Sequence, residues 1–131
     1  MFKFSRNQNG ANHEKYIELP TTASETYTQG EALVLSSGAL TKCGATTKPT
    51  HIAGCDYVAP ASGNKPLPCY RIFEGYELET TLQAAGTSLN IGDKVTLHTD
   101  GLQVTATTSS GVAEIVNLIE TAIGGRVIVK F

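Results

Sequence analysis

Residues 95–106 read VTLHTDGLQVTA, and this stretch is the clearest guide to the fold. Apolar and polar residues alternate on both sides of the central Asp-Gly pair, as they do in two antiparallel strands with one buried face. Asp-Gly is favoured at the centre of a type I′ turn, where both φ angles are positive. The sequence therefore predicts a β-hairpin in which Asp100 and Gly101 are structural turn residues.

A second hairpin is predicted over residues 32–43, which read ALVLSSGALTKC. The two apolar runs flank Ser37 and Gly38, and glycine adopts a positive φ without steric cost. Gly38 is therefore the expected turn residue of this hairpin.

Composition extends the same interpretation to the whole chain. Its 131 residues include 17 Thr, 8 Ser and 13 Gly but no Trp, a composition that favours strands and turns over helices. Residues 112–119 fit either a helical face or a strand, and their β-branched side chains favour the strand. We predict an all-β class: a small barrel or β-tulip-like domain of hairpins with an extended N-terminal arm.

The surroundings of the two hairpins suggest an internal repeat. Gly30-Glu31 and Gly92-Asp93 each precede a hairpin, and Thr-Thr pairs follow both hairpins. We therefore divide the predicted β domain, residues 19–131, into two similar modules, 19–69 and 70–131. The alternative is that any β-rich chain of Gly, Thr and Leu produces such matches.

Residues 1–18 show no sustained period of two or 3.6 and are rich in polar and charged side chains. Four apolar residues stand isolated in this segment: Phe2, Phe4, Tyr16 and Ile17. We interpret the segment as an extended arm whose apolar residues contact a partner, with a frayed terminus as the alternative.

A ten-residue loop is predicted at residues 59–68, which contain three prolines, a Gly and an Asn. Loops of this length often make functional contacts. Pro60 and Pro66 are therefore added to the candidate contact residues.

Charge and motifs argue against several classes of function. The formal net charge of −2 shows no basic signature for nucleic acid, and no apolar run is long enough for a membrane span or a secretory signal. Three widely spaced cysteines, Cys43, Cys55 and Cys69, indicate reduced, buried thiols and not a disulfide framework or a zinc site. The three histidines, His13, His51 and His98, show no metal-ligand spacing. We expect no cofactor, no metal, no small-molecule substrate and no catalysis.

The order of elements resembles that of tailed-phage head decoration proteins of the lambda type. The resemblance is carried by GEALVL at 30–35, SGALT at 37–41, HIAGC at 51–55 and CYRI at 69–72, followed by Gly75-Tyr76. A polar NGAN segment at 9–12 and GVAEIV at 111–116 are similar to segments of small phage structural proteins. The part after Leu82 departs from the pattern, because lambda-type proteins are shorter and have no obvious second Gly-Asp hairpin.

This resemblance implies a non-catalytic virion structural protein that is made in the host cytoplasm and binds the outside of the phage head. The implied partner is the major capsid protein, whose lattice it stabilises, and the implied assembly is a homotrimer. A different class, a carbohydrate- or receptor-binding β-domain of a fibre or cell-surface protein, remains the alternative, although five Tyr and no Trp give it little support. A hydrolase using Asp56, Asp93 or Asp100 is the least favoured interpretation.

Overall fold

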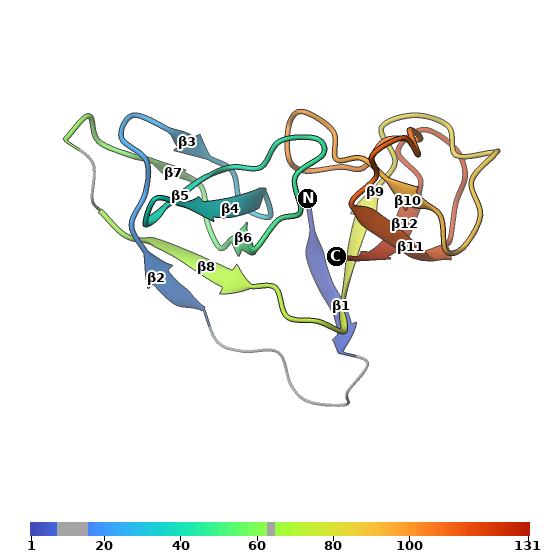
Figure 1. Ribbon diagram of the computed structural model, residues 1–131, viewed down its shortest axis with the longest axis horizontal. Helices are drawn as coiled ribbons and strands as arrows, with labels where there is room; N and C mark the ends of the chain where they lie inside the picture. The colour runs from blue at the N-terminus through green and yellow to red at the C-terminus, as the bar shows by residue number, and fades with distance from the viewer. Residues whose placement is uncertain (8–15, 63–64) are drawn as a thin grey trace.

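The computed structural model describes residues 1–7, 16–62 and 65–131. Every regular element in these ranges is a β-strand (Figure 1), so the predicted all-β class is confirmed. The strands are β1 (Lys3–Asn7), β2 (Ile17–Leu19), β3 (Thr26–Tyr27), β4 (Ala32–Ser36), β5 (Ala39–Lys42), β6 (His51–Ala53), β7 (Tyr57–Val58), β8 (Leu67–Arg71), β9 (Tyr76–Thr81), β10 (Lys94–Val95), β11 (Ala113–Leu118) and β12 (Arg126–Lys130). The strand interpretation of residues 112–119 is confirmed by β11.

The strands form two open five-stranded sheets and a short ribbon. The first sheet has the order β2-β8-β6-β4-β5, the second has the order β1-β9-β12-β11-β10, and β3 pairs with β7 in the ribbon. The two sheets occupy opposite ends of the long axis (Figure 1), and we call these ends the first and second lobes. Each sheet keeps two edge strands, so the described strands do not close the expected barrel and instead form packed sheets resembling a sandwich.

The two lobes share one hydrophobic core. Its buried members include Ala32 and Ile52 from the first sheet and Ile115 and Val127 from the second. On the other face of the first sheet, a separate cluster joins Leu33, Leu40 and Leu67 to Tyr27 of the ribbon. The first sheet is therefore covered on both faces, and the lobes are parts of one packed body.

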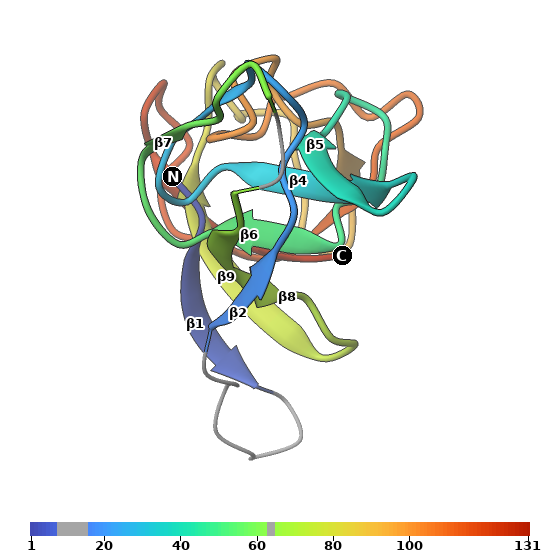
Figure 2. The same cartoon turned by 90° about the vertical axis from the view of Figure 1, so that its left-hand side faces the viewer.

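The expectation of a free arm is wrong for the first residues of the chain. Strand β1 pairs antiparallel with β9, with Phe4 opposite Leu78, and Figures 1 and 2 show the two strands side by side. Phe2 is only 3% exposed, and its amide donates to the carbonyl of Gly30 at 2.9 Å. Residues 8–15 lie outside the described residues. Because Phe2 is buried and β1 pairs with β9, this segment is part of the second sheet and does not extend away from the domain.

The hairpin of residues 32–43 forms as predicted. Ser36 pairs with Ala39, which leaves Ser37 and Gly38 as the two central residues of the turn. Their φ values are 50° and 81°, as a type I′ turn requires.

The Asp100-Gly101 hairpin keeps its predicted register but not its predicted turn. Leu97 bridges Val104, as a loop centred on Asp100 and Gly101 requires. Only Gly101, with a φ of 67°, has a positive φ, and its amide donates to the carbonyl of His98 at 3.0 Å. The His98 amide donates to the Gln103 carbonyl at 2.9 Å, so residues 99–102 form a four-residue loop in which Gly101 has the left-handed backbone.

Candidate interaction surface

The six predicted contact residues do not form one surface. Phe2 is buried, whereas Phe4 is 38% exposed and Tyr16 is 57% exposed. Ile17 is half-buried in β2, where it pairs with Cys69 of β8. The structure brings only Phe2 and Phe4 to a common site.

The two loop prolines lie near the segment that follows β2. The carbonyl of Pro60 accepts a hydrogen bond from the Ser24 amide at 3.2 Å, and the carbonyl beside Pro66, that of Lys65, accepts one from the Thr21 hydroxyl at 2.8 Å. Pro66 is exposed and Pro60 is partly exposed. These prolines belong to the first lobe and do not line the site that holds Phe2 and Phe4.

That site is a groove of about 370 Å³ lined by residues 1–4, 29–30, 52–54 and 70–72 together with Tyr76 and Leu78. It lies where the second sheet's edge strand β1 meets the ends of β6 and β8, and we call it the β1–β8 groove. Phe2, Ile52 and Leu78, all at least 95% buried, supply its deepest apolar surface. Phe4 and Tyr70, 38% and 40% exposed, supply aromatic surface that solvent reaches. The volume lies at the lower end of the range for ligand sites, about 300–1,000 Å³.

Aromatic contacts hold the groove's side chains in position. The Phe2 ring meets Phe131 edge to face at 5.6 Å between centroids. Phe4 meets Tyr76 at 5.4 Å, and Phe73 meets Tyr76 at 5.5 Å. The Arg71 guanidinium lies 5.7 Å from the Phe73 centroid, within range of a cation–π interaction. These contacts between aromatic rings therefore hold the groove in a preformed shape.

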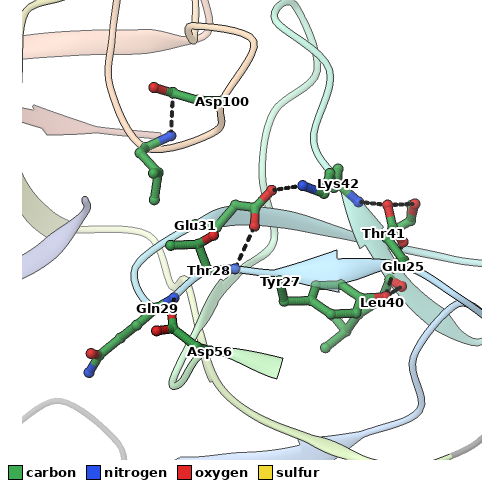
Figure 3. Close-up of polar contacts among 11 residues, drawn as sticks. Glu25, Tyr27, Thr28, Gln29, Glu31, Leu40, Thr41, Lys42, Asp56 and Asp100 are labelled. Atoms are coloured by element: carbon green, nitrogen blue, oxygen red, sulfur yellow. Dashed lines mark hydrogen bonds and ion pairs between the residues drawn. The ribbon is translucent and has the colours of Figure 1, made fainter. Parts of the chain in front are cut away.

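The carboxylates of the first lobe act as structural hydrogen-bond acceptors (Figure 3). Glu25 accepts from the Tyr27 hydroxyl at 3.0 Å and from the Thr41 hydroxyl at 3.1 Å. Glu31, which is 1% exposed, accepts from the Thr28 amide at 2.8 Å and pairs with the Lys42 ammonium at 3.2 Å. These bonds fix the segments that enter and leave β4.

The three aspartates of the hydrolase interpretation are not brought together in one hydrogen-bonded set. Asp56 accepts from the Gln29 amide at 2.7 Å, Asp93 accepts from the Asn90 amide at 2.8 Å, and Asp100 accepts from the Leu102 amide at 2.8 Å. Each carboxylate thus satisfies a different backbone amide, the ordinary role of Asp in turns.

Asp100 also pairs with His98, with 3.1 Å between Nδ1 and Oδ2. Burial alone raises the pKa of the Asp100 carboxyl, but hydrogen bonds from the Leu102 amide and His98 outweigh it. The pKa of Asp100 therefore lies below its usual value. This pair supports the loop between the two strands of its hairpin.

His51 is the most buried histidine that the structure describes, at 4% exposure. Its Nδ1 lies 2.8 Å from the Thr50 hydroxyl, whereas its buried Nε2 has no hydrogen-bond partner among the described residues. Burial, and secondarily the charge of Arg71, lower the pKa of His51. The folded protein therefore favours neutral imidazole at this position.

The thiol expectation is confirmed for two of the three cysteines. Cys43 and Cys69 are buried and reduced, and burial raises the pKa of each to about 11. Cys55 is reduced but only half-buried. In the parts of the chain that the structure describes, no group of three or more His, Cys, Asp or Glu side chains is placed to hold a metal ion.

Sequence reasoning missed Tyr70, Arg71 and the part of the groove that β6 supplies. The CYRI segment at 69–72 was noted for the resemblance, and the groove depends on segments from four distant parts of the chain. The only local sequence signal for this part of the groove was the presence of aromatic residues near strand ends.

Comparisons with known proteins give no indication of function, so the inference of function depends mainly on the groove. No protein-family model matches the chain, and a search of curated proteins found no significant match. Within the described ranges, the structure contains no helix with the length and apolar character needed to cross a bilayer.

Proposed function

We propose that this chain is a non-catalytic virion structural protein that binds the outside of a tailed-phage head and stabilises the major capsid protein lattice. The observation that carries the proposal is the β1–β8 groove, a preformed apolar cleft bordered by exposed aromatic side chains. Buried aromatic anchors in well-packed pockets contribute most of the free energy in many protein interfaces. The proposed partner is therefore a protein surface and not nucleic acid.

Rigidity supports a stabilising role. The amide of Ala32 donates to the Gly101 carbonyl at 2.8 Å, and the amide of Leu97 donates to the Ala45 carbonyl at 2.9 Å, so hydrogen bonds join the lobes. The shared core adds apolar contacts across the same junction. A body that deforms little loses little entropy when it binds, which favours a clamp between subunits.

The proposed contact surface differs from the expected arm. Phe2 supports the floor of the groove, and Phe4 takes the role of exposed contact residue. Tyr16, Ile17, Pro60 and Pro66 are proposed as secondary contacts of the first lobe. In a homotrimer, three such surfaces would engage neighbouring capsid subunits together, and the effective concentration would strengthen individually weak contacts.

A carbohydrate-binding role is the second candidate, because one specific observation favours it. Tyr70 and Phe4 present aromatic surface beside Gln29 and Arg71, and open clefts that combine aromatic rings with a few polar groups suit sugar rings. The protein-binding proposal is preferred because three large apolar side chains of the lining, those of Phe2, Ile52 and Leu78, are buried.

The proposal is tested with empty heads assembled from the major capsid protein encoded nearest to this chain. We expect saturable co-sedimentation, a higher melting temperature of the heads, and a trimer mass by light scattering. Phe4→Ala should weaken binding about 5- to 30-fold, the effect of a contact worth roughly 1–2 kcal/mol. Val58→Ala, at a 68% exposed position that does not line the groove, is the matched control. Absence of head binding together with binding to a glycan array would favour the second candidate.

A further inference from the structure

We propose that the β1–β8 groove recognises a short extended protein segment in which a large apolar side chain enters the groove and an adjacent carboxylate pairs with Arg71. This inference rests on the proposed function, because it takes the occupant to be a segment of a partner protein. It adds the chemical class of the segment that is recognised.

The apolar part of the recognition follows from the burial of the lining residues. An inserted side chain would contact the buried floor of Phe2, Ile52 and Leu78 and would remove water from the exposed surfaces of Phe4 and Tyr70. Aromatic pairs contribute beyond the burial of their area when their rings meet edge to face or offset. An aromatic or large aliphatic side chain therefore fits the groove better than a polar one.

The floor is held in place before any ligand arrives. The Phe2 amide is bonded to the Gly30 carbonyl at 2.9 Å, and the Phe2 ring packs against Phe131. Phe4 packs against Tyr76, which in turn packs against Phe73. A groove with fixed walls binds with little ordering cost, so even a short segment can gain measurable affinity.

The charge of the lining residues selects the flanking group. Among the described residues that line the groove are Lys3 and Arg71, with no Asp or Glu, although the formal charge of the whole chain is −2. Lys3 stands opposite Glu79 in the strand register.

Arg71 is the cation that we expect to pair with the carboxylate of the bound segment. It is exposed, and none of the salt bridges among the described residues includes it. The Phe73 ring lies 5.7 Å from its guanidinium carbon and limits where the side chain lies. A carboxylate next to the inserted side chain would complete a charge-assisted hydrogen bond with this guanidinium.

The test uses three capped peptides. The first is acetyl-Gly-Asp-Phe-Asp-Gly-amide; the second replaces both Asp residues by Asn, and the third replaces the Phe by Ala. Each is titrated into the isotopically labelled full chain, and amide shifts of the groove residues report binding. We expect the Asp-Phe-Asp peptide to bind about two- to fivefold more tightly than the Asn-Phe-Asn peptide, the effect of an exposed ion pair. We expect the Asp-Ala-Asp peptide to bind most weakly.

Two pairs of variants separate the apolar and ionic contributions. Arg71→Gln should abolish the preference for Asp over Asn, whereas Arg126→Gln, an equal charge change outside the groove lining, should keep it. Tyr70→Ser should weaken all Phe peptides about two- to tenfold, whereas Tyr16→Ser, at another exposed tyrosine, should not. Raising the salt concentration should reduce the Asp preference, because exposed charges are screened.

Several outcomes would overturn the inference. Equal binding of the Asp and Asn peptides would show that the groove does not recognise a carboxylate. Amide shifts confined to residues outside the groove would show that the peptide binds elsewhere. A concentration-dependent dimer that Tyr70→Ser disrupts would mean that a second copy of this chain fills the groove. Oligosaccharide binding in the groove without peptide binding would assign the site to sugars.

Head binding is measured separately, so the two proposals can fail independently. If the wild type and Arg71→Gln co-sediment equally with heads and no peptide binds, the groove inference fails while the capsid role stands. If the peptides bind with the expected preference but heads do not, the capsid role fails and the groove specificity stands.

Discussion

The two lobes are built from the same strand-and-turn composition, yet they complete their sheets differently. The first sheet uses strands from one continuous stretch, residues 17–71, whereas the second adds β1 from the start of the chain to strands from residues 76–130. The first lobe also has a local core of its own, whereas the main core is shared. The difference shows that the second lobe depends on the N-terminal segment.

The two hairpins also differ in how much their turns depend on distant parts of the chain. The Ser37-Gly38 turn is set by its own backbone, and a Cβ added at Gly38 would have no heavy atom within 4 Å. The Gly101 turn packs on the first lobe, where a Cβ would come within 2.9 Å of the Glu31 side chain. One turn is locally determined, and the other is shaped by the junction between the lobes.

The largest expected effect comes from breaking the dependence on the N-terminal segment. Phe2→Ala should lower the free energy of unfolding by about 3–5 kcal/mol, because it removes a buried aromatic side chain from the shared core. Phe4→Ala, on the same strand but 38% exposed, should cost clearly less. Urea denaturation measures both values, and equal small losses would mean that β1 contributes little to the second sheet.

A smaller effect distinguishes the two turns. Gly38→Ala should cost about 1–2 kcal/mol, the strain of a left-handed backbone for a residue with a side chain. Gly101→Ala should cost roughly 1 kcal/mol more, because the new Cβ also meets buried Glu31. Thermal melting of the two variants tests the comparison, and equal shifts would indicate that the junction adjusts without cost.

The smallest effect concerns the buried histidine of the first lobe. Because the folded-state pKa of His51 is lowered, its contribution to stability is present above the unfolded pKa of about 6.5. That contribution is lost as pH falls through the folded-state pKa. His51→Gln should flatten this part of the profile of unfolding free energy against pH.

His98→Gln is the control, because His98 belongs to the second lobe and lies beside Asp100 on the partly exposed turn. It should leave the dependence that comes from His51 in place. An unchanged slope in His51→Gln would contradict the assignment to the buried imidazole.

Local patterns predicted a large part of the fold for physical reasons. Alternation over residues 95–106 indicated one hairpin, because a strand with one buried face needs side chains of period two. Two apolar runs on either side of Ser37-Gly38 indicated the other. The same argument missed β1, since FKFS at residues 2–5 supplies only four alternating residues before a polar run. So short a run has no local feature that separates an edge strand from a solvated arm.

The candidate site was less accessible to prediction. Phe2 and Phe4 were singled out correctly as apolar points, but their partners Ile52, Tyr70 and Tyr76 come from other strands. Sequence alone gave no register between β1 and β9, and the register decides which faces of the two strands meet.

By itself, the sequence determined the all-β class, the positions of the hairpins and the glycine requirement of their turns, because these depend on backbone preferences and on period-two alternation within a few residues. Only the tertiary structure decided that β1 completes the second sheet, that Lys94, Glu114 and Lys130 align across three strands, and that an aromatic groove opens between the lobes. These features depend on pairing between segments far apart in the chain. Shared burial determines that pairing, and local preference does not.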